Sequence, residues 1–215
     1  MKLYPRVLAL VITTLFCIAA IGQPPEQTPP ISMGIVLDAS GSMGIRLARA
    51  RQLVSELLKL TGALDEFALI QASDRPIVVS GYGSTADALQ TQVSFVQPKG
   101  RSAVLDGIYM GLQVSKAGRN ARKVLLVISD GGENSSRYTE TEIKSAISET
   151  GVRIYVVGVD ESIAGRGRSS EEVAGQGVLL RIADRGGRYF SMERTTNLPQ
   201  AALELISAMR APLQP

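Results

Sequence analysis

The sequence predicts an α/β fold: a doubly wound, mostly parallel sheet with helices on both faces. Short apolar segments alternate with longer ones whose apolar residues recur every three or four positions, as in amphipathic helices. Segments 31–37 and 124–129 are apolar almost throughout, which is typical of strands buried on both faces. Segments 66–72 and 76–80 are joined by only three residues, which predicts a hairpin and therefore one antiparallel strand.

The other elements follow in chain order. We expect two further strands, at 152–159 and 188–190, and six helices, at 44–60, 85–96, 104–115, 139–150, 178–184 and 198–209. Segment 161–177 is rich in Gly, Ser and charged residues and is expected to be a surface excursion. We find no internal repeat and predict one domain over residues 31–211.

The N-terminus has the pattern of a secretory signal peptide over residues 1–22. Lys2 and Arg6 precede an apolar run from Val7 to Ile21, and a small-x-small site at 20–22 predicts a mature start at Gln23. A Pro-rich linker, 23–30, follows. The alternative is an uncleaved membrane anchor, although 15 apolar residues are short for a full span. Either way, we expect the protein to be secreted or to lie in the periplasm or cell envelope.

Composition excludes several classes of chemistry. Histidine is absent and Cys17 is the single cysteine, which excludes Ser-His-Asp and Cys-His nucleophiles, imidazole metal ligands and an internal disulfide. Without residues 1–22, Lys plus Arg falls from 23 to 21 against 20 Asp plus Glu, so the net charge falls from +3 to +1. This balance gives no argument for nucleic-acid binding.

Oxygen-bearing side chains follow the two most apolar strands. Asp38, Ser40 and Ser42 come directly after segment 31–37, and Asp130 comes after segment 124–129. Ligands of doubly wound sheets bind beyond the carboxyl ends of the strands, where the strand order reverses, so these side chains are expected to converge. Ser102, in the loop before helix 104–115, can reach the same point. Hard cations such as Mg²⁺ or Mn²⁺ prefer such oxygen ligands, and Ca²⁺ is an alternative.

Each of these residues also has a purely structural interpretation. Asp38 can cap the following helix, and Ser102 can cap helix 104–115 while still binding a metal. Asp130 can be a turn residue, because two glycines follow it.

Taken together, these motifs closely resemble the von Willebrand factor type A domain with its metal-ion-dependent adhesion site. The resemblance covers about Ile31 to Met209 and rests on VLDASGSM, KGRSAVLDGIY, VLLVISDGGENSSR and IYVVGVD. More narrowly, the motifs look like those of secreted bacterial relatives of the acidobacterial type. The resemblance implies a Rossmann-like sheet of six strands with one antiparallel edge strand. It also implies that Ser40 and Ser42 bind the metal directly, that Asp38 and Asp130 bind directly or through water, and that Ser102 replaces the usual threonine.

The middle loop departs from the family pattern. The usual Gly-Gly-Thr is Gly100-Arg101-Ser102 here. Serine keeps the hydroxyl oxygen but lacks the methyl group that restricts its rotamers. Arg101 either is solvated without a role or places a cation beside the site, where it can weaken metal binding or hold an acidic ligand.

Three functions remain open. The first is a secreted, non-enzymatic binding module that recognises a protein through the metal, with the partner's Asp or Glu completing the coordination. The second is a structural or assembly component of the cell envelope in which the metal is incidental. The third is a Mg²⁺-dependent phosphatase-like enzyme. It is disfavoured because Ser40 stands where such enzymes need an acid/base carboxylate.

Overall fold

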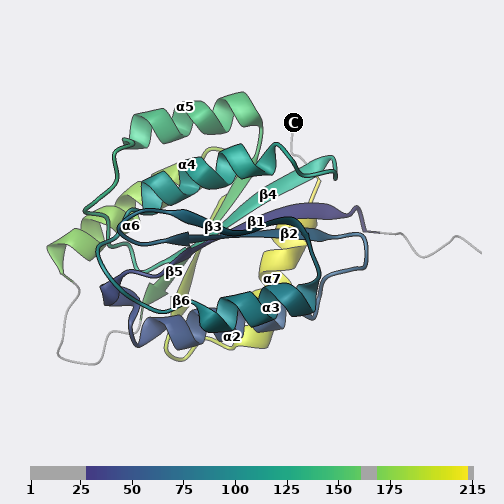
Figure 1. Ribbon diagram of the computed structural model, residues 1–215, viewed down its shortest axis with the longest axis horizontal. Helices are drawn as coiled ribbons and strands as arrows, with labels where there is room; N and C mark the ends of the chain where they lie inside the picture. The colour runs from purple at the N-terminus through teal and green to yellow at the C-terminus, as the bar shows by residue number, and fades with distance from the viewer. Residues whose placement is uncertain (1–27, 161–168, 213–215) are drawn as a thin grey trace, which may run out of the picture.

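Six strands form one sheet in the order β3-β2-β1-β4-β5-β6 (Figure 1). The computed structural model describes residues 28–160 and 169–212. The strands are β1 (Ile31–Asp38), β2 (Glu66–Ala72), β3 (Ile77–Ser84), β4 (Arg122–Ser129), β5 (Arg153–Asp160) and β6 (Arg188–Glu193). All neighbouring pairs are parallel except β2 and β3. The predicted fold class is therefore confirmed, including the six strands and the antiparallel edge strand.

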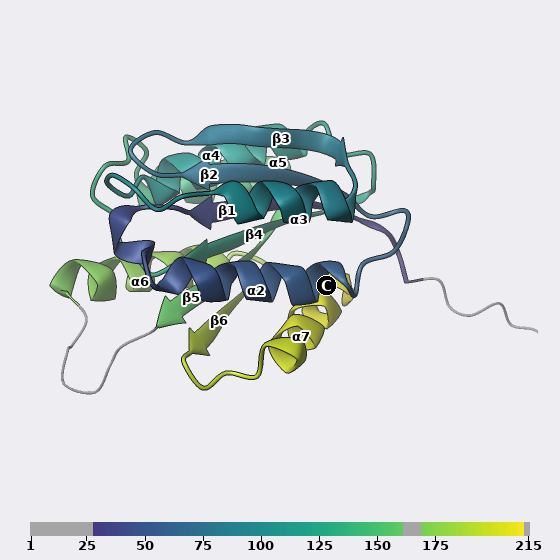
Figure 2. The ribbon, with the colours of Figure 1, turned by 60° about the horizontal axis from the view of Figure 1, so that its bottom comes forward.

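Helices cover both faces of this sheet (Figures 1 and 2). On one face the core joins the sheet to α2 (Arg46–Leu58), α3 (Ala86–Phe95) and α7 (Leu198–Arg210). On the other face it joins the sheet to α4 (Val104–Ser115), α5 (Glu140–Thr150) and α6 (Ser170–Ala183). A short 3-10 helix, η2 (Gly41–Met43), lies between β1 and α2. No helix in the described part of the chain is both long and apolar enough to span a membrane.

The two most apolar strands, β1 and β4, are neighbours at the centre of the sheet, with Leu37 beside Ile128 in register. The chain runs outward from β1 to β2 and β3, and then returns through α4 to β4 on the other side of β1. The strand order therefore reverses between β1 and β4. The carboxyl ends of these strands form the crevice in which ligands of such sheets bind.

Glycines let α4 lie close to the sheet. A Cβ at Gly107 would be 2.9 Å from the Cβ of Ala72, and a Cβ at Gly111 would be 2.7 Å from Leu125 Cδ1. Side chains at these two positions would push the helix away from the sheet. Close packing of α4 on the sheet therefore positions the preceding loop, which carries Ser102, relative to the ends of the strands.

One predicted element is wrong. Residues 161–177 were expected to be an excursion with a helix only from 178, but α6 begins at Ser170. Ser169 and Glu172 form a capping box there, which stabilises the helix start. Gly175 suggested a loop, but a Cβ at this position would lie 1.8 Å from the Gly131 carbonyl oxygen. This glycine therefore permits close packing within a helix.

Two predicted strands are longer in the structure, and the predicted N-terminal segments are mostly not described. Strands β3 and β6 extend beyond the predicted 76–80 and 188–190. The predicted signal peptide and most of the predicted linker lie outside the described residues.

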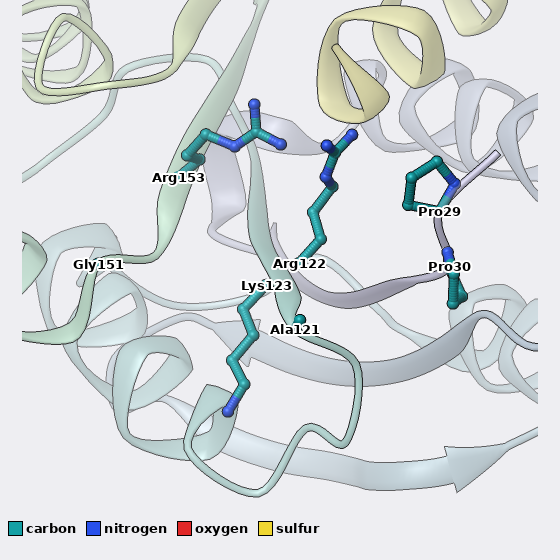
Figure 3. Close-up of a pocket in the computed structure, with 7 residues that line it drawn as sticks. All are labelled: Pro29, Pro30, Ala121, Arg122, Lys123, Gly151 and Arg153. Carbon is teal, nitrogen blue, oxygen red and sulfur yellow. The ribbon is translucent and has the colours of Figure 1, made fainter. Parts of the chain in front are cut away.

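At the end of the sheet opposite the crevice, arginines at the starts of two strands bind the C-terminal end of α7. Arg153, at the start of β5, donates to the carbonyl oxygens of Met209 (2.6 Å) and Ala211 (3.1 Å), and Arg122 of β4 donates to the carbonyl of Arg210. The Arg122 and Arg153 side chains extend toward the same turn of α7 (Figure 3). These cations satisfy carbonyls that a helix end leaves unpaired.

Candidate metal centre

The end of β1 places a buried carboxylate behind two hydroxyls. Asp38 has no exposed surface, and its Oδ1 accepts a 2.9 Å hydrogen bond from the Ser40 backbone N–H. This bond turns the chain after the strand. The Ser40 and Ser42 hydroxyl oxygens then lie 3.0 Å apart.

The end of β4 adds the second carboxylate. Ser129 Oγ donates to Asp38 Oδ2 at 2.7 Å, which joins the two strand ends. Asp130 is 2% exposed, and its Oδ1 accepts from the Gly132 backbone N–H at 3.0 Å. The predicted convergence of Asp38 and Asp130 therefore matches the arrangement in the structure.

Ser102 approaches the same point from the loop before α4. Its Oγ lies 3.4 Å from Asp38 Oδ2 and donates to the Gly132 carbonyl at 2.6 Å. Backbone hydrogen bonds tie this loop to the first one, from Gly41 N to Gly100 O (2.9 Å) and from Lys99 N to Ala39 O (2.8 Å).

Neither Ser102 nor Asp38 has the helix-capping role that the sequence offered as an alternative. Ser102 does not cap α4: the N-cap is Ala103, and the Glu133 carboxylate accepts from the Leu105 N–H at 2.9 Å instead. Asp38 bonds to the Ser40 N–H, which lies ahead of α2, so it does not cap that helix.

A cavity of about 170 Å³ opens above these side chains. Its lining combines the three predicted hydroxyls with the middle loop and the start of α6: Ser40, Ser42, Gly100, Arg101, Ser102, Gly132, Asn134, Ser169, Glu171 and Glu172. Asp38 and Asp130 are buried next to these hydroxyls and do not line the cavity. All five predicted site residues thus lie in one cluster.

Burial dominates the electrostatics of this cluster. The pKa of Asp38 is raised to about 6, mainly by burial and also by the negative charge of Asp130, while hydrogen bonds from Ser129 and Ser40 oppose the rise. A bound cation would favour the ionised carboxylate that burial disfavours.

The donor set fits a hard divalent cation. Two ligands at about 2.1 Å from Mg²⁺ and at right angles are about 3 Å apart, which is the separation of the Ser40 and Ser42 hydroxyls. Within the described residues, no group of three or more His, Cys, Asp or Glu is arranged to hold a metal. A metal held among the five predicted residues would therefore depend on three hydroxyls and two carboxylates.

Arg101 is solvated and structurally engaged. Its backbone N–H donates to Asp74 Oδ1 at 2.6 Å, and its guanidinium donates to the Asn134 carbonyl. The side chain is exposed at the rim of the cavity.

Sequence reasoning missed three residues at this centre. Ser129 immediately precedes Asp130, and a polar residue ending an apolar strand was its signal. Arg46 stands one helical turn after Ser42, and its Nη1 reaches Asp130 Oδ2 at 2.8 Å. Glu172 belongs to the capping box of α6, a pattern that could have been found from the sequence.

The family is decided by a match to a model of the von Willebrand factor type A domain over residues 33–203. The chain belongs to this family. No match is found among curated proteins.

Solved structures share the fold at low sequence identity. An aerotolerance-related membrane protein from Bacteroides fragilis has a TM-score of 0.67 at 19% identity, covering 83% of this chain and 98% of that one. The von Willebrand factor domain of the type V pili tip protein Mfa5 from Porphyromonas gingivalis has 0.62 at 11%, covering 87% and 99%. The pilus adhesin SpaC from Lactobacillus rhamnosus GG has 0.65 at 14%, covering 88% of this chain but 32% of the adhesin.

Proposed function

We propose that this von Willebrand factor type A domain is a non-enzymatic binding module that recognises a protein partner through a divalent metal. The observation that carries the proposal is the incomplete donor set beside an open cavity. Ser40, Ser42 and Ser102 present hydroxyls to that cavity, and the two carboxylates lie behind them. Mg²⁺ or Mn²⁺ needs more ligands than these residues supply.

The protein residues have distinct roles in this proposal. Ser40 and Ser42 would hold the metal directly, Ser102 would complete the protein side, and Asp38 and Asp130 would supply the negative charge. The bound metal supplies a Lewis-acidic position that an Asp or Glu of the partner fills. Exposed Arg101 at the rim offers a second positive group to the same carboxylate.

The other functions have less support. Relatives by fold include a pili tip protein and a pilus adhesin, which favours an interaction module on a cell surface, secreted or held in the envelope. A constitutive envelope component would keep its contacts when the metal is removed. A phosphatase would need an acid/base group at Ser40, and a hydroxyl does not serve that role.

Binding to an array of acidic peptides tests the proposal. Each Asp- or Glu-containing peptide is paired with its Asn or Gln counterpart, and the full chain is applied in Mg²⁺ or in EDTA. We expect binding to some acidic peptides only, lost in EDTA and in Asp38→Ala, and retained in the control Ser115→Ala. Equal binding in EDTA would contradict metal-dependent recognition. Turnover of a generic aryl phosphate, lost in Asp38→Ala, would favour the enzyme instead.

A further inference from the structure

A guanidinium from α2 already occupies one side of the candidate metal centre. Arg46 Nη1 donates to Asp130 Oδ2 at 2.8 Å, to Glu172 Oε1 at 3.0 Å and to the Ser42 carbonyl at 2.9 Å. The side chains of Arg46, Asp130 and Glu172 are 15%, 1% and 14% exposed, respectively. The positive charge of Arg46 is thus largely buried beside two carboxylates.

We propose that Arg46 is an internal competitor of the metal: it neutralises Asp130 when no metal is bound and withdraws from Asp130 when one binds. This inference rests on the proposed function, because it concerns the regulation of the same centre. It makes metal affinity depend on a residue that is not itself a ligand.

The contact geometry favours displacement. A guanidinium Nη carries two hydrogens, but Arg46 Nη1 faces three acceptors, and Arg46 Nε is buried without a partner. Strong Arg–carboxylate pairs use two parallel hydrogen bonds from two nitrogens. Arg46 is therefore held mainly by charge, in a geometry that makes poor use of its five donors.

Arg46 would keep a carboxylate partner after it leaves Asp130. A divalent cation beside Asp38 and Asp130 would replace the compensation that Arg46 gives Asp130, and it would repel the guanidinium. Glu172 would remain as a carboxylate partner for Arg46. The displaced cation therefore need not be buried unpaired, which is the costly outcome for such groups.

Metal titration of the full chain tests the inference. The protein is stripped with EDTA, dialysed and titrated with MnCl₂ or MgCl₂ in a calorimeter. Arg46→Met removes the charge and keeps an unbranched side chain. We expect Arg46→Met to bind the metal about tenfold tighter than the wild type, which corresponds to about 1.4 kcal/mol. In EDTA the same variant should unfold at lower urea, because Asp130 loses its counter-charge.

Arg51→Met is the matched control, since Arg51 lies on the same helix but donates to the Val96 carbonyl, away from the centre. It should leave metal affinity unchanged. If Arg46 were only a strut between α2 and α6, its removal would loosen the centre and weaken binding. Unchanged or weaker metal binding by Arg46→Met therefore overturns the inference about Arg46 and leaves the proposed function standing.

Two further outcomes are separable. If neither the wild type nor Arg46→Met binds either metal, the proposed function fails and the inference fails with it. If Arg46→Met does not fold, Arg46→Lys replaces it. Lysine keeps the charge on a shorter, differently shaped side chain, so its weaker hold on Asp130 should still raise metal affinity. Unchanged affinity in Arg46→Lys would then overturn the inference.

Discussion

Ser129 Oγ donates a 2.7 Å hydrogen bond to Asp38 Oδ2, from the last residue of one central strand to the last residue of its neighbour. The two residues lie one position beyond the registered pair Leu37–Ile128. Both are fully buried. The bond fixes the orientation of the Asp38 carboxylate, and with it the relation between the two loops that carry the site.

Removing this bond should weaken both the fold and the centre. We expect Ser129→Ala to lower the free energy of unfolding by about 1.5–3 kcal/mol, the range for hydrogen bonds to charged groups, and to reduce metal affinity. Urea unfolding and calorimetry measure the two effects. Ser115→Ala, which removes another buried hydroxyl that bonds to the Leu112 carbonyl, is the control. Loss of metal affinity in Ser115→Ala as well would show that the effect is not specific to Asp38.

The packing of α6 on the Asp130 loop gives a second prediction. Gly175→Ala would place a Cβ 1.8 Å from the Gly131 carbonyl oxygen, so the helix must move. We expect this variant to lower the free energy of unfolding by about 1–3 kcal/mol, as overpacking does. Urea unfolding measures the change.

A neighbouring glycine provides a control of opposite sign. At Gly177 the nearest atom to a new Cβ is Arg181 Nη1 at 3.3 Å, the end of a flexible side chain. Gly177→Ala should therefore be neutral or stabilising by up to about 1 kcal/mol, since alanine is the better helix former. Equal destabilisation by both variants would show that the contact with Gly131 is not the cause.

Glu140 should make stability depend on pH at the acidic end. Hydrogen bonds from Arg181 and then Lys144 lower its pKa from 4.5 to about 2. Because the folded-state pKa is depressed, this stabilisation is present above about pH 4.5 and is lost as the pH falls toward 2. The effect should be modest, since Arg181 is 52% exposed and solvent screens the pair.

Urea unfolding at pH 5, 4 and 3 checks this prediction. The stability difference between the wild type and Glu140→Gln should shrink as the pH falls. Glu149→Gln, on the same helix, is the matched control, because Glu149 makes no ion pair within the described residues. A Glu140→Gln difference that stays constant from pH 5 to 3 would contradict the assignment.

The sequence predicted the fold well where local pattern and tertiary packing agree. β1 and β4 are apolar along nearly their whole length because both faces are covered, and Asp38 and Asp130 mark their ends. The start of α6 was mispredicted because Gly175 permits close contact with the Gly131 loop, which helical periodicity does not encode. The capping box at Ser169 and Glu172 indicates a helix start in the sequence, but the glycine content of this segment favoured a loop in the prediction.

The residues of the candidate site also fall into those that the sequence could predict and those that it could not. Side chains fixed by strand ends, such as Asp38 and Asp130, were predictable from spacing. Contacts between distant elements were not: Arg46 and Glu172 are 126 positions apart in the chain and meet at 3.0 Å. Glu133 likewise takes the capping role at α4 that sequence spacing had offered to Ser102.

The most direct test of the central claim is a thermal melt of the full chain in EDTA and in millimolar Mg²⁺ or Mn²⁺, compared with the Ser40→Ala, Ser42→Ala double variant. A metal that binds only the folded state stabilises it by about 2.7 kcal/mol at one hundred times its dissociation constant. The account predicts a rise in Tm for the wild type that is absent in the double variant. No rise in the wild type, or an equal rise in both proteins, would contradict a metal centre built on these hydroxyls.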